Sequence, residues 1–286
     1  MAAIGITVAT PAFGEVFYTP YVQSLLRLQR ALNERQWTMR HAAVSYAHVN
    51  EARNYLLTHW YDKSDSSHLL FVDADMGFEP RLVLDMIAFD KPVVGVVYTK
   101  RQVDLKRLAA AAKVEPEARA IARAHDFILR PLRGKVPRRQ KGFMEVAACG
   151  TGLMLIKREA IATLLERLPR VSEPTEMSAS PLSAGLARMI RAFDNVTVDG
   201  QLLVNDFAFC HRWQALCGGE IWARIDEAVT HIGLHKFAAR YVDAGGGPSI
   251  TLTRDKPARA PGGSRFAPRV VTGRLPPAPK GKPRGT

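Results

Sequence analysis

The sequence predicts an α/β fold with a doubly wound sheet. Short apolar runs alternate with helical patterns over the first hundred residues, an order typical of strand–helix–strand crossovers. At 286 residues and 47% hydrophobic, the chain can bury one large core or the cores of two fused halves. Polar clusters follow three of the expected strands, at Thr10–Pro11, Asp73–Asp75 and Tyr98–Arg101. Ligands of such sheets bind beyond the carboxyl ends of the strands, so the clusters predict a site there.

The elements of the first hundred residues follow from the spacing of their apolar side chains. A strand is expected where β-branched or apolar residues run together, and a helix where they recur every three or four residues. The run at 92–98 is almost continuously apolar, which is typical of a parallel strand covered on both faces. The expected strands are 4–10, 37–45, 69–72 and 92–98, and the expected helices are 21–34, 48–61 and 80–89.

Beyond Arg101 the pattern loosens. An Ala-, Lys- and Arg-rich stretch predicts one helix over 104–124, and a hairpin is expected between 127–132 and 143–146, around a basic turn. Asn205 is expected to cap the helix that begins there. The remaining expected elements are a strand entered through Gly150–Gly152, helices over 159–168 and 205–216, a mobile Ser/Pro-rich loop at 170–183 and a strand at 221–224.

The net charge of +13 is concentrated in two segments. Residues 100–141 contain thirteen Lys and Arg against four Asp and Glu, and residues 245–286 contain nine against one. Such a balance favours polyanionic partners. The second segment is Gly- and Pro-rich without periodicity, so a disordered tail is expected over 245–286.

The cysteines and the apolar runs predict a cytoplasmic location. Cys149, Cys210 and Cys217 are odd in number, widely spaced and without a Cys-x-x-Cys pair, which favours reduced thiols. Neither a basic and apolar leader nor an apolar run of bilayer length is present in the sequence. Secretion and a transmembrane segment are therefore not expected, while peripheral contact with a membrane stays open.

Asp73 and Asp75 end an apolar run, one residue apart. In a strand, residues two apart point to the same face, so two carboxylates would lie side by side. That arrangement suits Mg²⁺ or Mn²⁺ holding a substrate diphosphate. A strand followed by an ordinary acidic turn is the alternative interpretation.

The order of the motifs resembles that of metal-dependent glycosyltransferases of the GT-A fold, close to the family-2-like bacterial and phage members. The resemblance covers about residues 4–237. It rests on Ala9-Thr10-Pro11, Ala52-Arg53-Asn54, Phe71-Val72-Asp73-Ala74-Asp75, Val94 to Arg101, Gly150-Thr151-Gly152, Asn205-Asp206-Phe207 and Thr230-His231-Ile232-Gly233.

The resemblance implies a mixed sheet with helices on both faces and a GT-A domain over 1–240. Within it, 1–101 would be the nucleotide-binding half and 102–240 the acceptor half, with a basic insertion at 102–143.

The resemblance also assigns the donor site, which would take a UDP- or GDP-sugar. Asp75 is the expected direct ligand of Mn²⁺ or Mg²⁺, and Asp73 would approach the metal while holding the ribose. His231 is the expected third ligand, with His235 in competition. Arg53 would reach the base or diphosphate, unless it lies on a solvated helix face. The other expected donor-binding residues are Thr10, Pro11, Tyr98, Lys100, Arg101, Gly150, Thr151 and Gly152.

On the acceptor side, Asp206 matches the general base of the inverting members of the family. A helix N-terminus would keep its carboxylate ionised, although the residue could also serve as a helix cap. Asn205 stands where the family has an acid, which leaves acceptor contacts and stereochemical outcome open. The acceptor is expected to be a polyanion, either a phosphorylated or lipid-linked glycan or a hydroxymethylated, phage-type DNA.

Two other functions compete with glycosyl transfer. A nucleotidyltransferase would also use strand-end carboxylates and a metal, but the stretch 9–14 lacks the basic residue of the usual glycine-rich signature. A non-catalytic glycan- or nucleic-acid-binding relic of the fold is the third hypothesis, against which the presence of Asp73, Asp75, Asp206 and His231 together argues.

Overall fold

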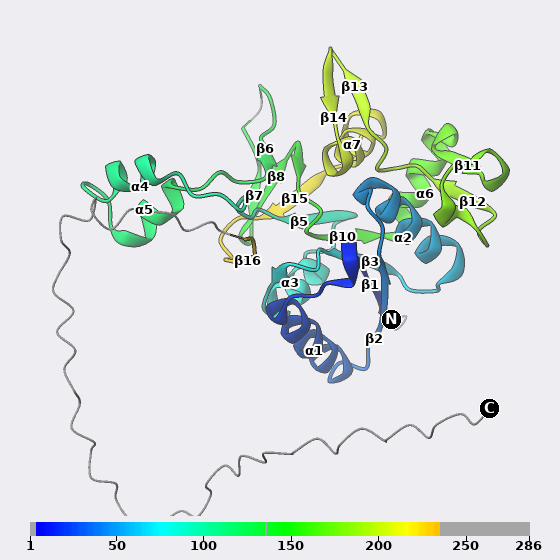
Figure 1. Cartoon of the computed structure of the whole chain (residues 1–286), viewed down its shortest axis with the longest axis horizontal. Helices are drawn as coiled ribbons and strands as arrows, with labels where there is room; N and C mark the ends of the chain where they lie inside the picture. The colour runs from blue at the N-terminus through cyan, green and yellow to red at the C-terminus, as the bar shows by residue number, and fades with distance from the viewer. Residues whose placement is uncertain (1–3, 135, 235–286) are drawn as a thin grey trace, which may run out of the picture. The chain divides into compact units, whose positions relative to one another are not determined.

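The computed structural model describes residues 4–134 and 136–234 (Figure 1). The predicted tail at 245–286 and His235 lie outside the described residues. In the described ranges, no helix is both long and apolar enough to cross a bilayer. The three cysteines are buried and free of disulfides.

An eight-stranded mixed sheet forms the centre, in the order β2-β1-β3-β10-β5-β15-β8-β7. β1 pairs in parallel with β2 and β3, and β5 pairs in parallel with β15, while β10 lies antiparallel between β3 and β5. The strands are β1 (Gly5–Pro11), β2 (Thr38–Val44), β3 (His68–Val72), β5 (Val93–Val96), β7 (Arg139–Gln140), β8 (Phe143–Val146), β10 (Leu153–Lys157) and β15 (Ile221–Arg224). The predicted mixed α/β sheet is confirmed.

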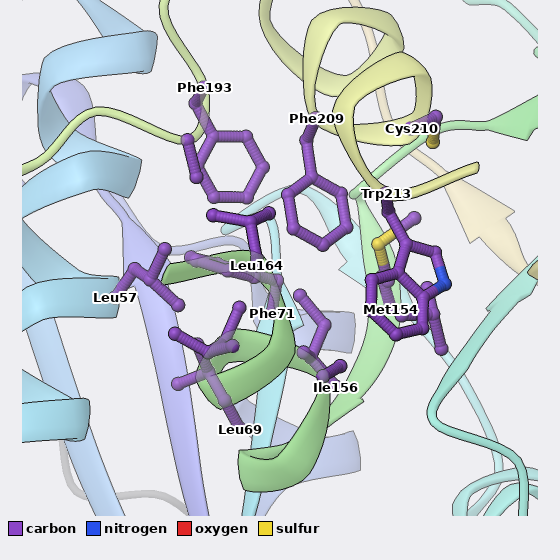
Figure 2. Close-up of a cluster of buried hydrophobic side chains, with 14 of the residues drawn as sticks. Leu57, Leu69, Phe71, Met154, Ile156, Leu164, Phe193, Phe209, Cys210 and Trp213 are labelled. Atoms are coloured by element: carbon purple, nitrogen blue, oxygen red, sulfur yellow. The ribbon is translucent and has the colours of Figure 1, made fainter. Parts of the chain in front are cut away.

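Helices cover both faces of this sheet. Because successive strand residues point to opposite faces, Leu70 and Val72 of β3 pack in one core, and Leu69 and Phe71 in the other. The first core receives α1 (Thr19–Asn33) and α3 (Pro80–Phe89). The second receives α2 (Val49–Lys63), α6 (Arg158–Arg167) and α7 (Asn205–His211), and Figure 2 shows its aromatic centre around Phe193 and Phe209.

The basic insertion differs from its prediction in two ways. The single helix expected over 104–124 is two helices, α4 (Leu105–Ala111) and α5 (Glu117–Arg123). Pro116 directly precedes α5, and a proline both lacks an N–H and disfavours helical geometry in the residue before it. The predicted pairing of 127–132 with 143–146 is wrong as well. β8 pairs with β7 through a tight turn at Lys141 and Gly142, both with positive φ, and β6 (Leu129–Arg130) pairs with β9 (Ala148–Cys149).

Three small two-stranded sheets complete the described fold. β4 (Met76–Gly77) pairs with β16 (Thr230–His231), β11 (Ser172–Pro174) with β12 (Arg188–Ile190), and β13 (Val196–Val198) with β14 (Gln201–Leu203). The segment predicted as a loop at 170–183 therefore contains a strand, and also three short 3-10 turns. Arg191 holds this segment, since its guanidinium bonds Glu173, Ser178 and Glu51 of α2.

Candidate functional site

The ends of three neighbouring strands meet at one edge of the sheet. β10 runs antiparallel to β3 and β5, so its first residues lie where those two strands finish. The Asp73 N–H donates to the carbonyl of Gly152 over 3.0 Å, and the Gly152 N–H donates to the Tyr98 hydroxyl over 2.9 Å. Asp73, Tyr98 and Gly150–Gly152 are thereby brought together.

The glycines are required by the position of Tyr98. A Cβ on Gly152 would lie 2.6 Å from the Tyr98 hydroxyl oxygen, and one on Gly150 would clash with the same atom. Tyr98 is only 4% exposed, and burial raises its pKa well above the ordinary value, so it stays neutral while its hydroxyl oxygen accepts the Gly152 N–H. The Tyr98 hydroxyl thereby fixes the position of the glycine loop.

The two aspartates of the acidic motif lie beyond the strand. β3 ends at Val72, and the Met76 N–H donates to the carbonyl of Asp73 over 3.0 Å, closing a turn. The backbone here therefore forms the acidic turn that the sequence offered as the alternative interpretation. The side chains have different partners, since Asp73 bonds Arg53 and Asp75 bonds Arg101.

The buried guanidinium of Arg53 interacts with two carboxylates, those of Asp73 and Asp206. It is 3% exposed, so the solvated helix face is excluded. Its Nη2 lies 2.8 Å from Oδ1 and 3.0 Å from Oδ2 of Asp73. Burial disfavours the charged guanidinium, but the negative charges of Asp73 and Asp206 outweigh burial and raise the pKa of Arg53.

Asp206 lies in the first turn of α7 and is poorly solvated. Burial raises the pKa of its carboxyl, opposed by the charge of Arg53 and by the Phe207 N–H, which donates to Oδ1 over 3.0 Å. Burial thus opposes the stabilisation of the charged form that the helix terminus was expected to give, and it is the largest influence on the pKa of this carboxyl. Val204, rather than Asn205, precedes the helix, and Asn205 adopts a left-handed φ of 48° without a side-chain capping bond.

Asp75 and His231 face each other because β16 pairs with β4. His231 lies opposite Met76, and the Ile232 N–H donates to the carbonyl of Asp75 over 2.9 Å. The Nδ1 of His231 donates to the carbonyl of Thr99 over 2.7 Å, which leaves Nε2 directed at Asp75 Oδ2, 3.6 Å away. Burial lowers the pKa of His231, but the Asp75 carboxylate and the Thr99 carbonyl more than compensate and raise it.

The donor set at Asp75 fits a divalent metal in part. In the described ranges, no three His, Cys, Asp or Glu residues form a ready metal cluster. A carboxylate and an imidazole nitrogen do meet at Asp75 and His231, and the bond from Nδ1 to Thr99 is the outer contact that typically orients a metal-binding histidine. Arg101, whose side chain is 54% exposed, donates to Asp75 Oδ2 over 2.8 Å, so a cation at this carboxylate would compete with the guanidinium.

The other predicted donor-binding residues lie in different environments. Thr10 is fully buried, and its hydroxyl is 2.6 Å from that of Tyr21, which is 2.9 Å from His41 Nε2. Pro11 is the last residue of β1 and is half-buried, and the Lys100 side chain is exposed.

Three buried polar side-chain atoms of the predicted site have no hydrogen-bond partner within 4–134 and 136–234. These are Oγ1 of Thr151, Nε of Arg53 and Oδ1 of Asn205. Buried polar atoms are normally paired, so their concentration at this edge is unusual. Sequence reasoning did not single out Thr99, which acts through its carbonyl, or Arg130, which lies in the basic insertion outside every quoted motif.

Comparison with known proteins gives distant structural neighbours only. No family model matches the sequence, and no curated protein matches it. A mutant of Drosophila β1,4-galactosyltransferase 7, in complex with manganese, UDP-Gal and xylobiose, is 9% identical, with a TM-score of 0.39 over 84% of this chain and 79% of that one.

Two further neighbours are equally distant. A TarS fragment from S. aureus in complex with UDP-GlcNAc is 12% identical, with a TM-score of 0.39 over 82% of this chain and 60% of that one. The inositol-1-phosphate CTP transferase from T. maritima is 9% identical, with a TM-score of 0.38 over 81% of this chain and 90% of that one. The neighbours thus include proteins that transfer a sugar and proteins that transfer a nucleotide.

Proposed function

We propose that this chain transfers a sugar from a nucleoside-diphosphate sugar to an acceptor hydroxyl, with a divalent metal at the diphosphate. The observation that supports it most is the pairing of Asp75 with His231, whose other ring nitrogen is bonded to Thr99. A second carboxylate, Asp206, lies within the electrostatic reach of Arg53 and Asp73 at the same edge.

On the donor side, the chain would bind the nucleotide along the carboxyl edge of β1 and β3. Asp73, oriented by Arg53, would hold the ribose, and Thr151, between the two glycines, would line the sugar site through its backbone. The glycine loop would let the sugar approach the backbone closely, since it carries no side chains at Gly150 and Gly152. Asp75 and His231 would hold Mn²⁺ or Mg²⁺, which when bound neutralises charge on the leaving diphosphate.

On the acceptor side, Asp206 would remove the proton from the attacking hydroxyl. Burial raises the pKa of its carboxyl and so makes the carboxylate a stronger base than an exposed one, while the charge of Arg53 favours the ionised form. A general base has to be both basic and ionised, and these two influences act on those two properties. Asn205, where the related family has an acid, would contact the acceptor as a neutral group.

The test is a panel of UDP-, GDP- and TDP-sugars, scored by thermal shift and by hydrolysis with and without Mn²⁺ or Mg²⁺. A metal-dependent shift with one donor, followed by slow release of the sugar, is the expected result. A parallel reaction with a nucleoside triphosphate and a sugar phosphate covers the alternative, because cleavage between the α- and β-phosphates with release of pyrophosphate would instead indicate a nucleotidyltransferase. If no sugar nucleotide shifts the melting temperature under any metal, the proposal fails.

A further inference from the structure

Arg130 lies beside the candidate site without belonging to any of its predicted parts. It is the last residue of β6 and stands opposite Ala148 of β9, two residues before Gly150. The Ala147 N–H donates to the Arg130 carbonyl over 2.9 Å, and Ile128, two residues earlier, packs against the position of Gly150. The strand that carries Arg130 therefore runs along the rim of the glycine loop.

The guanidinium of Arg130 is held against the element that carries Asp206. Its Cζ lies 4.6 Å from the ring centroid of Phe207, the residue after Asp206. Phe207 also donates its N–H to Asp206. Stacking on an aromatic ring orients the flat guanidinium and leaves its edge donors available.

Arg130 differs from Arg53, Arg101 and Arg138 in having no acidic partner among the described residues. Arg53 is bonded to Asp73, and Arg101 to Asp75. Arg138, in the same insertion, is bonded to Glu145 and Glu220. None of the salt bridges within 4–134 and 136–234 includes Arg130. An oriented, half-buried arginine without a counter-ion is suited to binding an anion from outside the chain.

We propose that Arg130 binds a phosphate group carried by a small acceptor, and so places the acceptor hydroxyl near Asp206. This inference rests on the proposed function and narrows its acceptor to a phosphate ester. A nucleic acid would need many exposed basic contacts, whereas Arg130 is half-buried against Phe207, and a part of the positive charge of the basic insertion is paired. Arg107 bonds Asp104 and Asp126, Arg123 bonds Glu115, and Arg138 bonds two glutamates.

The test uses phenyl phosphate as the probe and the full chain as the protein. The donor site is first filled with Mg²⁺ and the nucleoside diphosphate that gives the largest thermal shift, and binding is then followed by calorimetry. Arg130→Gln should weaken the binding of phenyl phosphate by about tenfold or more, the loss expected for a charged hydrogen bond. The affinity of Arg130→Lys for phenyl phosphate should lie between those of the wild type and Arg130→Gln, because lysine keeps the charge but lacks the planar guanidinium.

The matched control is Arg30→Gln, which removes the same charge from an exposed position on α1. It should change the affinity by less than about twofold, since exposed charges at a distance are screened. If Arg130→Gln does not fold, Phe207→Leu replaces it, since this variant keeps the charge and removes the ring, and should also weaken binding.

Three outcomes would overturn the proposal. One is unchanged affinity for phenyl phosphate in both Arg130→Gln and Phe207→Leu. Another is an equal loss of affinity for phenyl phosphate in Arg30→Gln, which would indicate general charge attraction. The third is that Arg130→Gln loses more affinity for a short duplex oligonucleotide than for phenyl phosphate, which would assign Arg130 to nucleic acid. Absence of sugar-nucleotide hydrolysis in the wild type, with binding of phenyl phosphate still dependent on Arg130, would reject the donor assignment alone.

Discussion

One nitrogen of Arg53, Nη2, lies within hydrogen-bonding distance of both carboxylate oxygens of Asp73, at 2.8 and 3.0 Å. The contact joins the buried face of α2 to the turn after β3. Because Asp206 also acts on this guanidinium, one buried charge balances two carboxylates that come from distant parts of the chain. The predictions below follow from this balance and from the contacts around it.

Removing Arg53 should destabilise the protein. Arg53→Ala leaves Asp73 and Asp206 without their compensating charge, and breaking a buried pair typically costs ~3 kcal/mol or more. Urea unfolding measures the difference. The control is Arg27→Ala, which breaks an exposed pair with Glu79 and should cost less than about 1 kcal/mol. Equal losses in the two variants would contradict a special role for Arg53.

Substitutions of Asp75 and Asp206 should affect different steps, donor binding for Asp75 and sugar transfer for Asp206. Asp75→Ala removes the carboxylate that faces His231, so the metal-dependent thermal shift with a sugar nucleotide should disappear. Asp206→Ala should retain that shift and lose transfer by about a hundredfold or more, the usual contribution of a general base. Full activity in Asp75→Ala would show that the metal assignment is wrong.

The rate of transfer should fall at acid pH. Asp206 must be ionised to accept a proton, and its pKa is raised by burial, so the rate should rise with pH through that raised pKa and then level off. In Arg53→Lys, which alters the opposing charge, the acid limb should shift toward higher pH if the ammonium lies farther from Asp206. A profile with no acid limb would remove Asp206 from the role of base.

Asp206→Asn should stabilise the folded chain at neutral pH. A raised folded-state pKa means that protonation favours folding, so this contribution is present at low pH and lost as pH rises through the folded pKa. A neutral amide avoids the loss, with a gain of ~1.4 kcal/mol for each unit by which the pKa is raised. The gain should shrink when unfolding is measured at low pH, and a gain independent of pH would point to another cause.

Substitutions in the glycine loop and at Tyr98 should have coupled effects on thermal stability. Gly152→Ala places a Cβ 2.6 Å from the Tyr98 hydroxyl oxygen, so the loop must shift and the thermal midpoint should fall. Tyr98→Phe removes that oxygen, and the double variant should lose less than the two single variants added together. Simple additivity would mean that the loop and the ring do not constrain each other.

Periodicity was sufficient to predict most of the first half of the fold. The helix expected at 80–89 begins at Pro80 and ends at Phe89, as observed. It was not sufficient where pairing connects distant segments, because spacing says nothing about partners. The antiparallel place of β10 between β3 and β5 and the pairing of β6 with β9 are of this kind.

The candidate site shows the same division. The order of the motifs singled out Asp73, Asp75, Asp206 and His231. In the structure, Asp73 and Asp206 both interact with Arg53, and Asp75 lies beside His231. What the sequence does not contain is the dielectric environment of each group. Burial of Arg53 and of Asp206 depends on how α2 and α7 pack on the second face of the sheet, so neither the role of Arg53 nor the raised pKa of Asp206 follows from residue type.

Among the described strands, β10 alone joins the two sides of the central sheet, since β3 pairs with β10 rather than with β5. During synthesis, the first hundred residues would leave β5 without a neighbour until residues 153–157 emerge. Residues 1–101 are therefore not expected to fold as an autonomous fragment, although they contain Arg53, Asp73 and Asp75. Long-range closure of this kind slows folding, and a nascent chain would complete the sheet edge that carries the candidate site only after β10 has been inserted.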